Sequence, residues 1–219
     1  MRLDDWFLRP EERGNPATRL DSRHPDGAAW TTGNHVRALP HGAAYFADLL
    51  VAIGRMRAGD LLLFTDWRGD PDERLDGPGT EVARVLSEAA GRGVDVRIMV
   101  PGENNDQPLT KSAGRGAYGK LLEGGVRIFE YEPTMIHIKS IVTDTLFSMI
   151  GSSNLDPRSA EINEELDVVV YDRDFGRQME ETFTQDLRQS REYTLEQFRR
   201  RSLWERTVEW LAYPFRSQL

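Results

Sequence analysis

The chain has 219 residues, of which 39% are hydrophobic and 29% charged, a balance typical of a soluble globular protein. The formal net charge of −8 disfavours general binding to nucleic acid, because the surface as a whole repels polyanions. No cysteine is present, which excludes disulfides and cysteine-based zinc sites. The N-terminus lacks the apolar core of a signal peptide, and no run approaches the ~18 apolar residues needed to span a bilayer. We therefore expect a cytoplasmic protein.

The N-terminal third of the chain predicts an arm followed by alternating strands and helices. Residues 1–33 are rich in Arg, Asp, Gly and Pro with little periodicity, and we expect an irregular surface arm. Apolar residues then recur at helical or strand spacing. The predicted elements are a strand at Val36–Leu39, a helix at Tyr45–Ile53, a buried strand at Asp60–Asp66, a helix at Glu81–Gly91 capped by Thr80, and a strand at Val94–Val100.

The remainder continues this alternation as far as Val170. The predicted elements are a helix at about Lys111–Glu123, a strand at Val126–Tyr131, a strand pair at His137–Val142 and Leu146–Ile150 joined near Asp144, and a last strand at Leu166–Val170. From Arg173 onward the sequence is mostly helical in character. The two glycine-ended segments that precede Val94 and Val126 are alike, and we interpret them as one helix-to-strand join used twice. The alternation favours an α/β domain with a largely central sheet.

Two scarce residues lie close together in the second half. The chain has only four histidines and three lysines, yet His137 and Lys139 are two positions apart in an apolar stretch, and Gly151-Ser-Ser-Asn154 follows. On a strand, residues two apart point to the same face, so these side chains would project side by side. A neutral imidazole that attacks and an ammonium that holds charge suit chemistry on an anion.

The pattern His-x-Lys-x4-Asp followed by Gly-Ser-x-Asn resembles the signature of the phospholipase D superfamily. From about Arg97 to Leu219 the chain resembles the C-terminal half of bacterial cardiolipin synthases, and residues 1–96 resemble the start of an actinobacterial phospholipase D-like protein. The first resemblance also involves five shorter stretches: Val100–Gly102, Gly125–Pro133, Leu155–Ser159, Asn163–Glu165 and Ser190–Leu195. The second involves Gly33–Val36 and Phe64–Asp70.

The resemblance implies a phospholipase D-like α-β-α sandwich with a mixed central β-sheet, in a single copy of the repeat. Such a domain would span residues 34–190, with one HxKx4D motif, and a helical C-terminal tail would span 191–219. Most members of these families carry two motifs that meet at one pocket. His24, His35 and His41 lack a lysine two positions on, so none of them belongs to a second motif.

The resemblance also implies roles for individual residues. His137 would attack phosphorus to give a phosphohistidine, while a second histidine protonates the leaving oxygen, without metal or cofactor. Lys139 and Asn154 would hold the non-bridging oxygens, and Ser152 would add a donor. Glu165 is the candidate to orient the imidazole, ahead of Glu164 and Glu161. Asp144 belongs to the signature, and we expect it to serve the turn between the strands.

The function implied is a phospholipase D-type phosphodiesterase or phosphatidyltransferase, similar to cardiolipin synthase, that acts on a phospholipid such as phosphatidylglycerol. One alternative is a single-motif endonuclease that pairs His137 from two chains in a homodimer, which the net charge of −8 disfavours. Another is a catalytically incomplete half-protein that needs a complementary half.

The tail combines aromatic and cationic residues. Trp204, Trp210, Tyr213 and Phe215 lie among arginines, a composition that suits peripheral contact with anionic lipid of the inner membrane. The alternative is a helix that packs its aromatic side chains on the core.

Overall fold

The computed structural model describes residues 42–67, 69–102 and 108–212, which all belong to one structural unit, Leu39–Leu219. The predicted arm, the strand at Val36–Leu39, the boundary at residue 34 and the aromatic residues Tyr213 and Phe215 lie outside the described residues. Within them, none of the helices is long and apolar enough to cross a bilayer.

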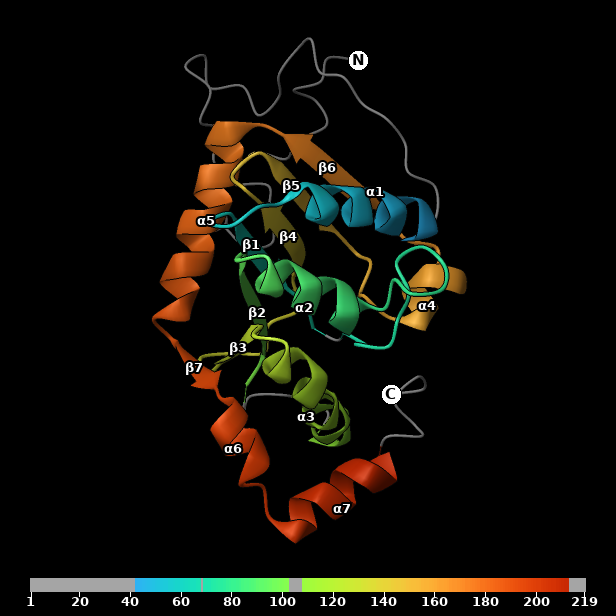
Figure 1. Ribbon diagram of the computed structural model, residues 1–219, viewed down its shortest axis with the longest axis vertical. Helices are drawn as coiled ribbons and strands as arrows, with labels where there is room; N and C mark the ends of the chain where they lie inside the picture. Colours follow the sequence, from blue (N-terminus) through green and yellow to red (C-terminus); the bar gives the residue numbers. More distant parts are fainter. Residues whose placement is uncertain (1–41, 68, 103–107, 213–219) are drawn as a thin grey trace, which may run out of the picture. The chain divides into compact units, whose positions relative to one another are not determined.

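A mixed β-sheet forms the centre of this unit (Figure 1). Its strands are β1 (Leu61–Thr65), β2 (Asp95–Pro101), β3 (Arg127–Tyr131), β4 (Lys139–Thr143), β5 (Phe147–Gly151), β6 (Asp167–Tyr171) and β7 (Ser190–Tyr193). Their order across the sheet is β6-β5-β4-β1-β2-β3-β7. β1, β2 and β3 are parallel neighbours, and every other pairing is antiparallel.

Helices pack on both faces of the sheet. They are α1 (Gly42–Arg55), α2 (Val82–Gly91), α3 (Pro108–Glu123), α4 (Pro157–Glu161), α5 (Arg173–Leu187), α6 (Leu195–Arg199) and α7 (Leu203–Ala212). Leu62 and Phe64 of β1 face the core beneath α1, α2 and α3, whereas Leu63 between them faces α5 through Phe183. This alternation is the period-2 geometry of a strand buried on both sides. The predicted α-β-α sandwich with a mixed sheet is confirmed.

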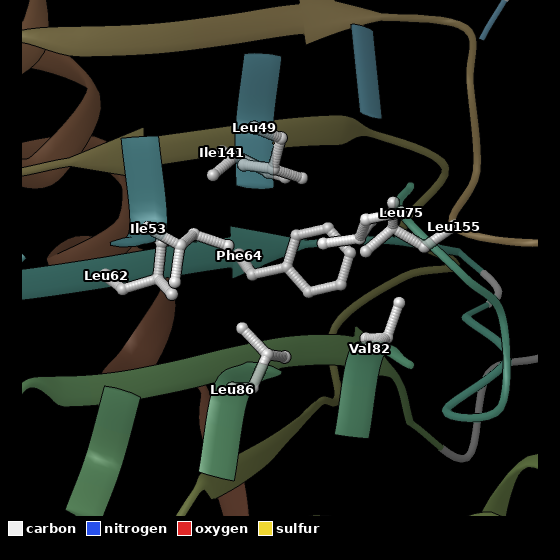
Figure 2. A pocket seen from close by; sticks show the side chains of 9 residues that line it. All are labelled: Leu49, Ile53, Leu62, Phe64, Leu75, Val82, Leu86, Ile141 and Leu155. Carbon is white, nitrogen blue, oxygen red and sulfur yellow. The ribbon is translucent and has the colours of Figure 1, made fainter. Parts of the chain in front are cut away.

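The larger core contains one small apolar cavity. Figure 2 shows Leu49 and Ile53 of α1 and Leu86 of α2 around Phe64 of β1, and together with their neighbours they enclose about 10 Å³. This volume is at the lower limit for a single water molecule, and no polar group lines the cavity. The core here is therefore apolar and closely packed.

The prediction that Leu166–Val170 is the last strand is wrong. β7 adds an antiparallel edge strand beside β3, so the predicted domain boundary between residues 190 and 191 falls inside a strand. Its sequence, Ser-Arg-Glu-Tyr, has only one buried residue, Tyr193, and thus gives almost no strand signal. Backbone pairing with β3 at the edge of the sheet therefore gives this segment its strand conformation.

A buried ion cluster holds this edge of the sheet. The fully buried carboxylate of Glu130 in β3 accepts two hydrogen bonds from the Arg115 guanidinium, each 2.7 Å, and one of 2.8 Å from Arg191 in β7. Arg115 also lies over the ring of Tyr193. Paired arginines make burial of the carboxylate tolerable, and the cluster joins α3, β3 and β7.

The join from helix to strand occurs twice with the same geometry, as the two similar segments predicted. Gly93 after α2 and Gly125 after α3 have φ of 91° and 87°, values that favour glycine. The next residue, Val94 or Val126, then donates its N–H to a carbonyl of the last helical turn, at 3.1 and 3.0 Å. Each join leads directly into one of two adjacent parallel strands.

Thr80 does not cap α2 with its side chain as predicted. The N-cap is Glu81, which makes no side-chain capping hydrogen bond. The Thr80 hydroxyl instead donates to the carbonyl of Gly77 and accepts from the N–H of Asp76. It therefore closes the preceding loop.

Candidate active site

The candidate site lies at one end of the sheet, where four strands begin or end. β1 ends at Thr65, opposite Ser140 near the start of antiparallel β4. Lys139 pairs with Gly151 at the end of β5, which in turn pairs with Asp167 at the start of β6. Residues that are distant in sequence thus meet at one edge because the strands alternate in direction.

His137 and Lys139 lie together, though not on one strand. β4 begins at Lys139, and His137 precedes it in an irregular segment, so the prediction that both lie on the strand is wrong. The side chains meet instead through a contact of 3.0 Å between Lys139 Nζ and His137 Nε2, and Nζ also donates to the His137 carbonyl at 3.2 Å. Because an ammonium can only donate, Nε2 faces it with its lone pair.

Lys139 is buried beside carboxylates. Burial lowers the pKa of the ammonium below its usual value, while the negative charges of Asp66, Glu165 and Asp156 oppose this shift. Its side chain is inside the protein, whereas His137 is exposed. The site thus has a buried cation beneath an accessible imidazole.

The Gly-Ser-Ser-Asn turn is fixed by Asp167. A Cβ at Gly151 would collide with the Asp167 side chain, so only glycine fits there. That carboxylate accepts a hydrogen bond from the Ser153 N–H at 3.2 Å and another from the Ser153 hydroxyl. Neither Asp167 nor Ser153 was among the residues predicted for the site.

Glu165 holds the other side of this turn. Its carboxylate accepts hydrogen bonds from Ser152 Oγ (2.6 Å), Ser159 Oγ (2.7 Å) and Asn163 Nδ2 (3.2 Å). Burial raises the pKa of Glu165, but these three hydrogen bonds and the Lys139 charge outweigh it, so the net shift is downward. Among the described residues, His137 is not one of the donors to this carboxylate. The orienting role predicted for Glu165 therefore stays a prediction. The Ser152 hydroxyl, expected to donate to phosphate, donates to Glu165 in this structure.

Glu164 is exposed, and the Glu161 side chain lies outside the described residues. Glu165, with its hydrogen bonds to the turn, therefore stays the first candidate for the orienting carboxylate.

Asn154 follows the turn and has one unsatisfied polar atom. Its backbone N–H donates to Ser159 Oγ at 3.1 Å, while its buried Oδ1 has no hydrogen-bond partner among the described residues. The next N–H, that of Leu155, donates at 3.0 Å to Asp66, which is buried at the end of β1. Asp66, another residue missed by sequence reasoning, thereby ties the turn to β1.

Asp144 lies at the opposite end of β4 from Lys139. Asp144 and Thr145 have positive φ values of 46° and 55°, and the N–H of Leu146 donates to the Thr143 carbonyl across the turn. The length of β4 separates Asp144 from Lys139 by roughly 16 Å. Its place in the turn agrees with the expected structural role and puts it outside the phosphate site.

No group of three or more metal-ligating side chains occurs in the part of the chain that the structure describes. The groups described at the site are the His137 imidazole and the Lys139 ammonium, beside a turn whose serine hydroxyls donate to Glu165 and Asp167.

Comparison with known proteins identifies the family of the chain. The family described as "Cardiolipin synthase, PLD-like domain" matches residues 74–187, just over half of the chain, and the match runs across residue 97 where the two resemblances meet. Cardiolipin synthase A of Proteus mirabilis is 38% identical over 138 residues, which are 63% of this chain and 28% of that protein. The minor cardiolipin synthase of Bacillus subtilis is 35% identical over 135 residues, 62% of this chain and 34% of that protein.

Solved structures share the fold. Nuc of Salmonella typhimurium, a phospholipase D family member, matches with a TM-score of 0.54 at 21% identity, covering 67% of this chain and 88% of that chain. Phosphatidylserine synthase of Haemophilus influenzae matches with a TM-score of 0.58 at 14% identity, covering 76% of this chain and 41% of that chain.

The fold and the His-Lys-Asn arrangement define a protein of the phospholipase D class. The chain belongs to the cardiolipin synthase, PLD-like domain family of this superfamily. It spans about a third or less of the length of the two cardiolipin synthases compared here.

Proposed function

We propose that the chain performs phospholipase D-type chemistry on a phosphodiester lipid, with His137 as the nucleophile. The observation that carries this proposal is the contact of 3.0 Å between Lys139 Nζ and His137 Nε2. An ammonium at Lys139 meets the lone pair of this imidazole nitrogen, so a nucleophile and a cationic donor lie side by side. A phosphate needs both a nucleophile and donors for its oxygens.

The proposed reaction has two displacements. Nε2 of His137 attacks phosphorus, a P–N bond forms, the bond to the leaving oxygen breaks, and that oxygen takes a proton from a second acid. An alcohol or water then attacks phosphorus, returns a proton to that group and releases His137. Lys139 moves its donor from Nε2 to a non-bridging oxygen in the first step, and Asn154 binds another through its amide.

The second acid is the missing component of this site. The sequence holds a single motif, so we propose that a second copy of the chain contributes its His137 across a twofold axis. Exposed apolar residues occur at this end of the sheet: Ile150 of β5 pairs with Val168 of β6, and Ile138 and Leu166 directly precede β4 and β6. Such a surface suits burial against another chain. A complementary half-protein is the alternative occupant.

We propose a phospholipid such as phosphatidylglycerol as the substrate, because the relatives with the highest similarity described above are cardiolipin synthases. The net charge of −8 supports this substrate over a nucleic acid, which would require many phosphate-binding cations. Incubation with phosphatidylglycerol vesicles should yield cardiolipin and glycerol for transfer, or phosphatidic acid for hydrolysis. Degradation of single-stranded DNA with no change in the lipid would contradict the proposal.

The chemistry can be tested with bis(p-nitrophenyl) phosphate in excess EDTA. We expect activity in the wild type, its loss in His137→Ala, and a decrease of about 100-fold or more in Lys139→Ala. Lys120→Ala is the matched control, because Lys120 is an exposed lysine of α3 that pairs with Asp72. Activity that persists in His137→Ala would refute His137 as the nucleophile.

Dependence on protein concentration tests the second chain. A site shared by two copies gives activity that rises more than linearly with protein, and Val168→Glu should lower it by weakening association. Activity strictly proportional to protein from a monomer would exclude the homodimer. An inactive monomer at all concentrations would favour the complementary half-protein.

A further inference from the structure

Trp67 contacts both residues of the motif, although it comes from a different part of the chain. It lies two residues after the end of β1, and its ring is 5.4 Å from the His137 ring, centroid to centroid, at an interplanar angle of 54°. The Nζ atom of Lys139 lies 5.8 Å from the centroid of the same indole. The indole therefore packs against the nucleophile and lies at the outer limit of a cation–π interaction with the ammonium.

The indole N–H of Trp67 is buried and has no acceptor among the residues that the structure describes. A buried donor without an acceptor is unfavourable, and such groups are rare in native proteins. An unsatisfied indole N–H on a ring that packs against the His–Lys pair indicates a place where a ligand with an acceptor oxygen supplies the missing partner.

The residue type at position 67 suits an anion. Asp66, its neighbour, is a buried carboxylate whose negative charge partly offsets the burial that lowers the pKa of Lys139. The neutral indole N–H of Trp67 makes no hydrogen bond to this carboxylate and stays available for a ligand. The indole also adds a donor without repelling the Lys139 ammonium.

We propose that Trp67 is a phosphate-binding residue of this site: its indole N–H donates to a non-bridging phosphoryl oxygen, while its ring positions His137 and Lys139. This inference rests on the proposed function, because it requires a phosphoryl group bound beside His137 and Lys139. It assigns to the segment that follows β1 a direct part in holding the substrate, beside the motif at the start of β4 and the turn after β5.

The test follows the indole N–H signal of Trp67 by NMR in ¹⁵N-tryptophan-labelled protein during titration with inorganic phosphate. The signal is identified by its loss in Trp67→Phe, which removes the donor and keeps an aromatic ring. We expect a saturable downfield shift of this signal. Trp67→Phe should bind phosphate about 10-fold more weakly, the effect of losing one hydrogen bond to a charged group. Its Tm should not fall, because the variant removes an unsatisfied buried donor.

Trp204→Phe is the matched control, since Trp204 is exposed on α7 and should leave phosphate binding unchanged. Lys139→Ala separates the two proposals. If Lys139→Ala loses phosphate binding while Trp67→Phe retains it and the indole signal does not move, the role of Trp67 is refuted and the proposed function stands. Weaker binding in Trp67→Phe with a lower Tm and a static wild-type indole signal would show a structural role only. Absence of phosphate binding by the wild type would overturn both proposals.

Discussion

Lys139 is a charged side chain in a buried position, and its surroundings decide how the site responds to pH. Burial lowers its pKa, and the carboxylates of Asp66, Glu165 and Asp156 limit that decrease. The rarity of lysine and histidine in this sequence was enough to predict that the side chains of His137 and Lys139 lie together. The residues that surround them could not be predicted: Asp66 binds the N–H of a residue 89 positions away, and no local pattern reports such a contact.

The lowered pKa predicts loss of anion binding at a lower pH than for an ordinary lysine. As pH rises, the Lys139 ammonium should be neutralised below pH 10.5, and phosphate affinity should fall with it. Lys139→Arg keeps its charge and should retain binding through this range. Titration by ³¹P NMR from about pH 7 to pH 10 measures this, with Lys120→Arg as the control. Parallel curves for the wild type and Lys139→Arg would contradict the prediction.

Glu165 should stabilise the Gly-Ser-Ser-Asn turn in a pH-dependent way. A folded-state pKa below 4.5 means that its stabilisation is present above that value and is lost as pH falls through the folded pKa. Glu165→Gln should therefore lower Tm by about 2–4 °C at neutral pH, corresponding to about 1 kcal/mol, and by progressively less below pH 4.5. Thermal unfolding at several pH values tests this, and the exposed neighbour variant Glu164→Gln should show no such trend.

At the scale of helices and strands, periodicity located those elements that bury a face. The strand around Phe64 and the helix around Leu86 were predictable because their apolar residues recur at strand or helix spacing. β7 was not, because its polar sequence becomes a strand only beside β3. The start of β4 was placed two residues early, since the apolar run that includes Ile136 and Ile138 continues beyond the paired segment.

The cavity between α1, α2 and β1 predicts a large cost for truncating a residue that lines it. Leu86→Ala would enlarge this small apolar cavity, because Leu86 is one of the closely packed side chains that line it. The variant should lower the free energy of unfolding by about 2–5 kcal/mol. Val51→Ala, on the exposed side of α1, should change it by about 0.5 kcal/mol or less. Urea unfolding compares the two, and equal effects would show that this core relaxes around the deletion.

At the scale of the whole molecule, the fold class and family were predictable from the motif, whereas the arrangement of the tail was not. α7 packs against α3, and Arg201 pairs with Glu209 within the tail. Trp204 and Leu203 are nevertheless 75% and 78% exposed, so the alternative that the tail buries its aromatic residues is wrong for Trp204. Because these apolar side chains are exposed and the neighbouring Arg199 and Arg200 are exposed as well, peripheral contact of the tail with anionic lipid stays a proposal.

Replacing the two exposed residues tests that contact without removing the packed helix. The double variant Leu203→Ser, Trp204→Ser should bind phosphatidylglycerol vesicles at least about 10-fold more weakly than the wild type, because it loses two apolar side chains that would enter the interface. Vesicle flotation measures the difference, and Val51→Ser is the control for an exposed apolar residue elsewhere. Equal flotation of all three proteins would exclude the tail as the membrane contact.

The central place of β1 also determines when the site can form during synthesis. β1 can pair with β2, and β2 with β3, as soon as residues up to 131 have emerged from the ribosome. The other edge of β1 waits for β4, with Leu62 pairing with Thr143 across a long sequence separation. Such non-local pairing slows folding, and an open central strand edge favours aggregation in the interval. Translation that pauses before the β4–β5 hairpin would therefore leave a nascent chain that holds Asp66 but lacks the proposed nucleophile, His137. Such a chain would depend on chaperones for solubility.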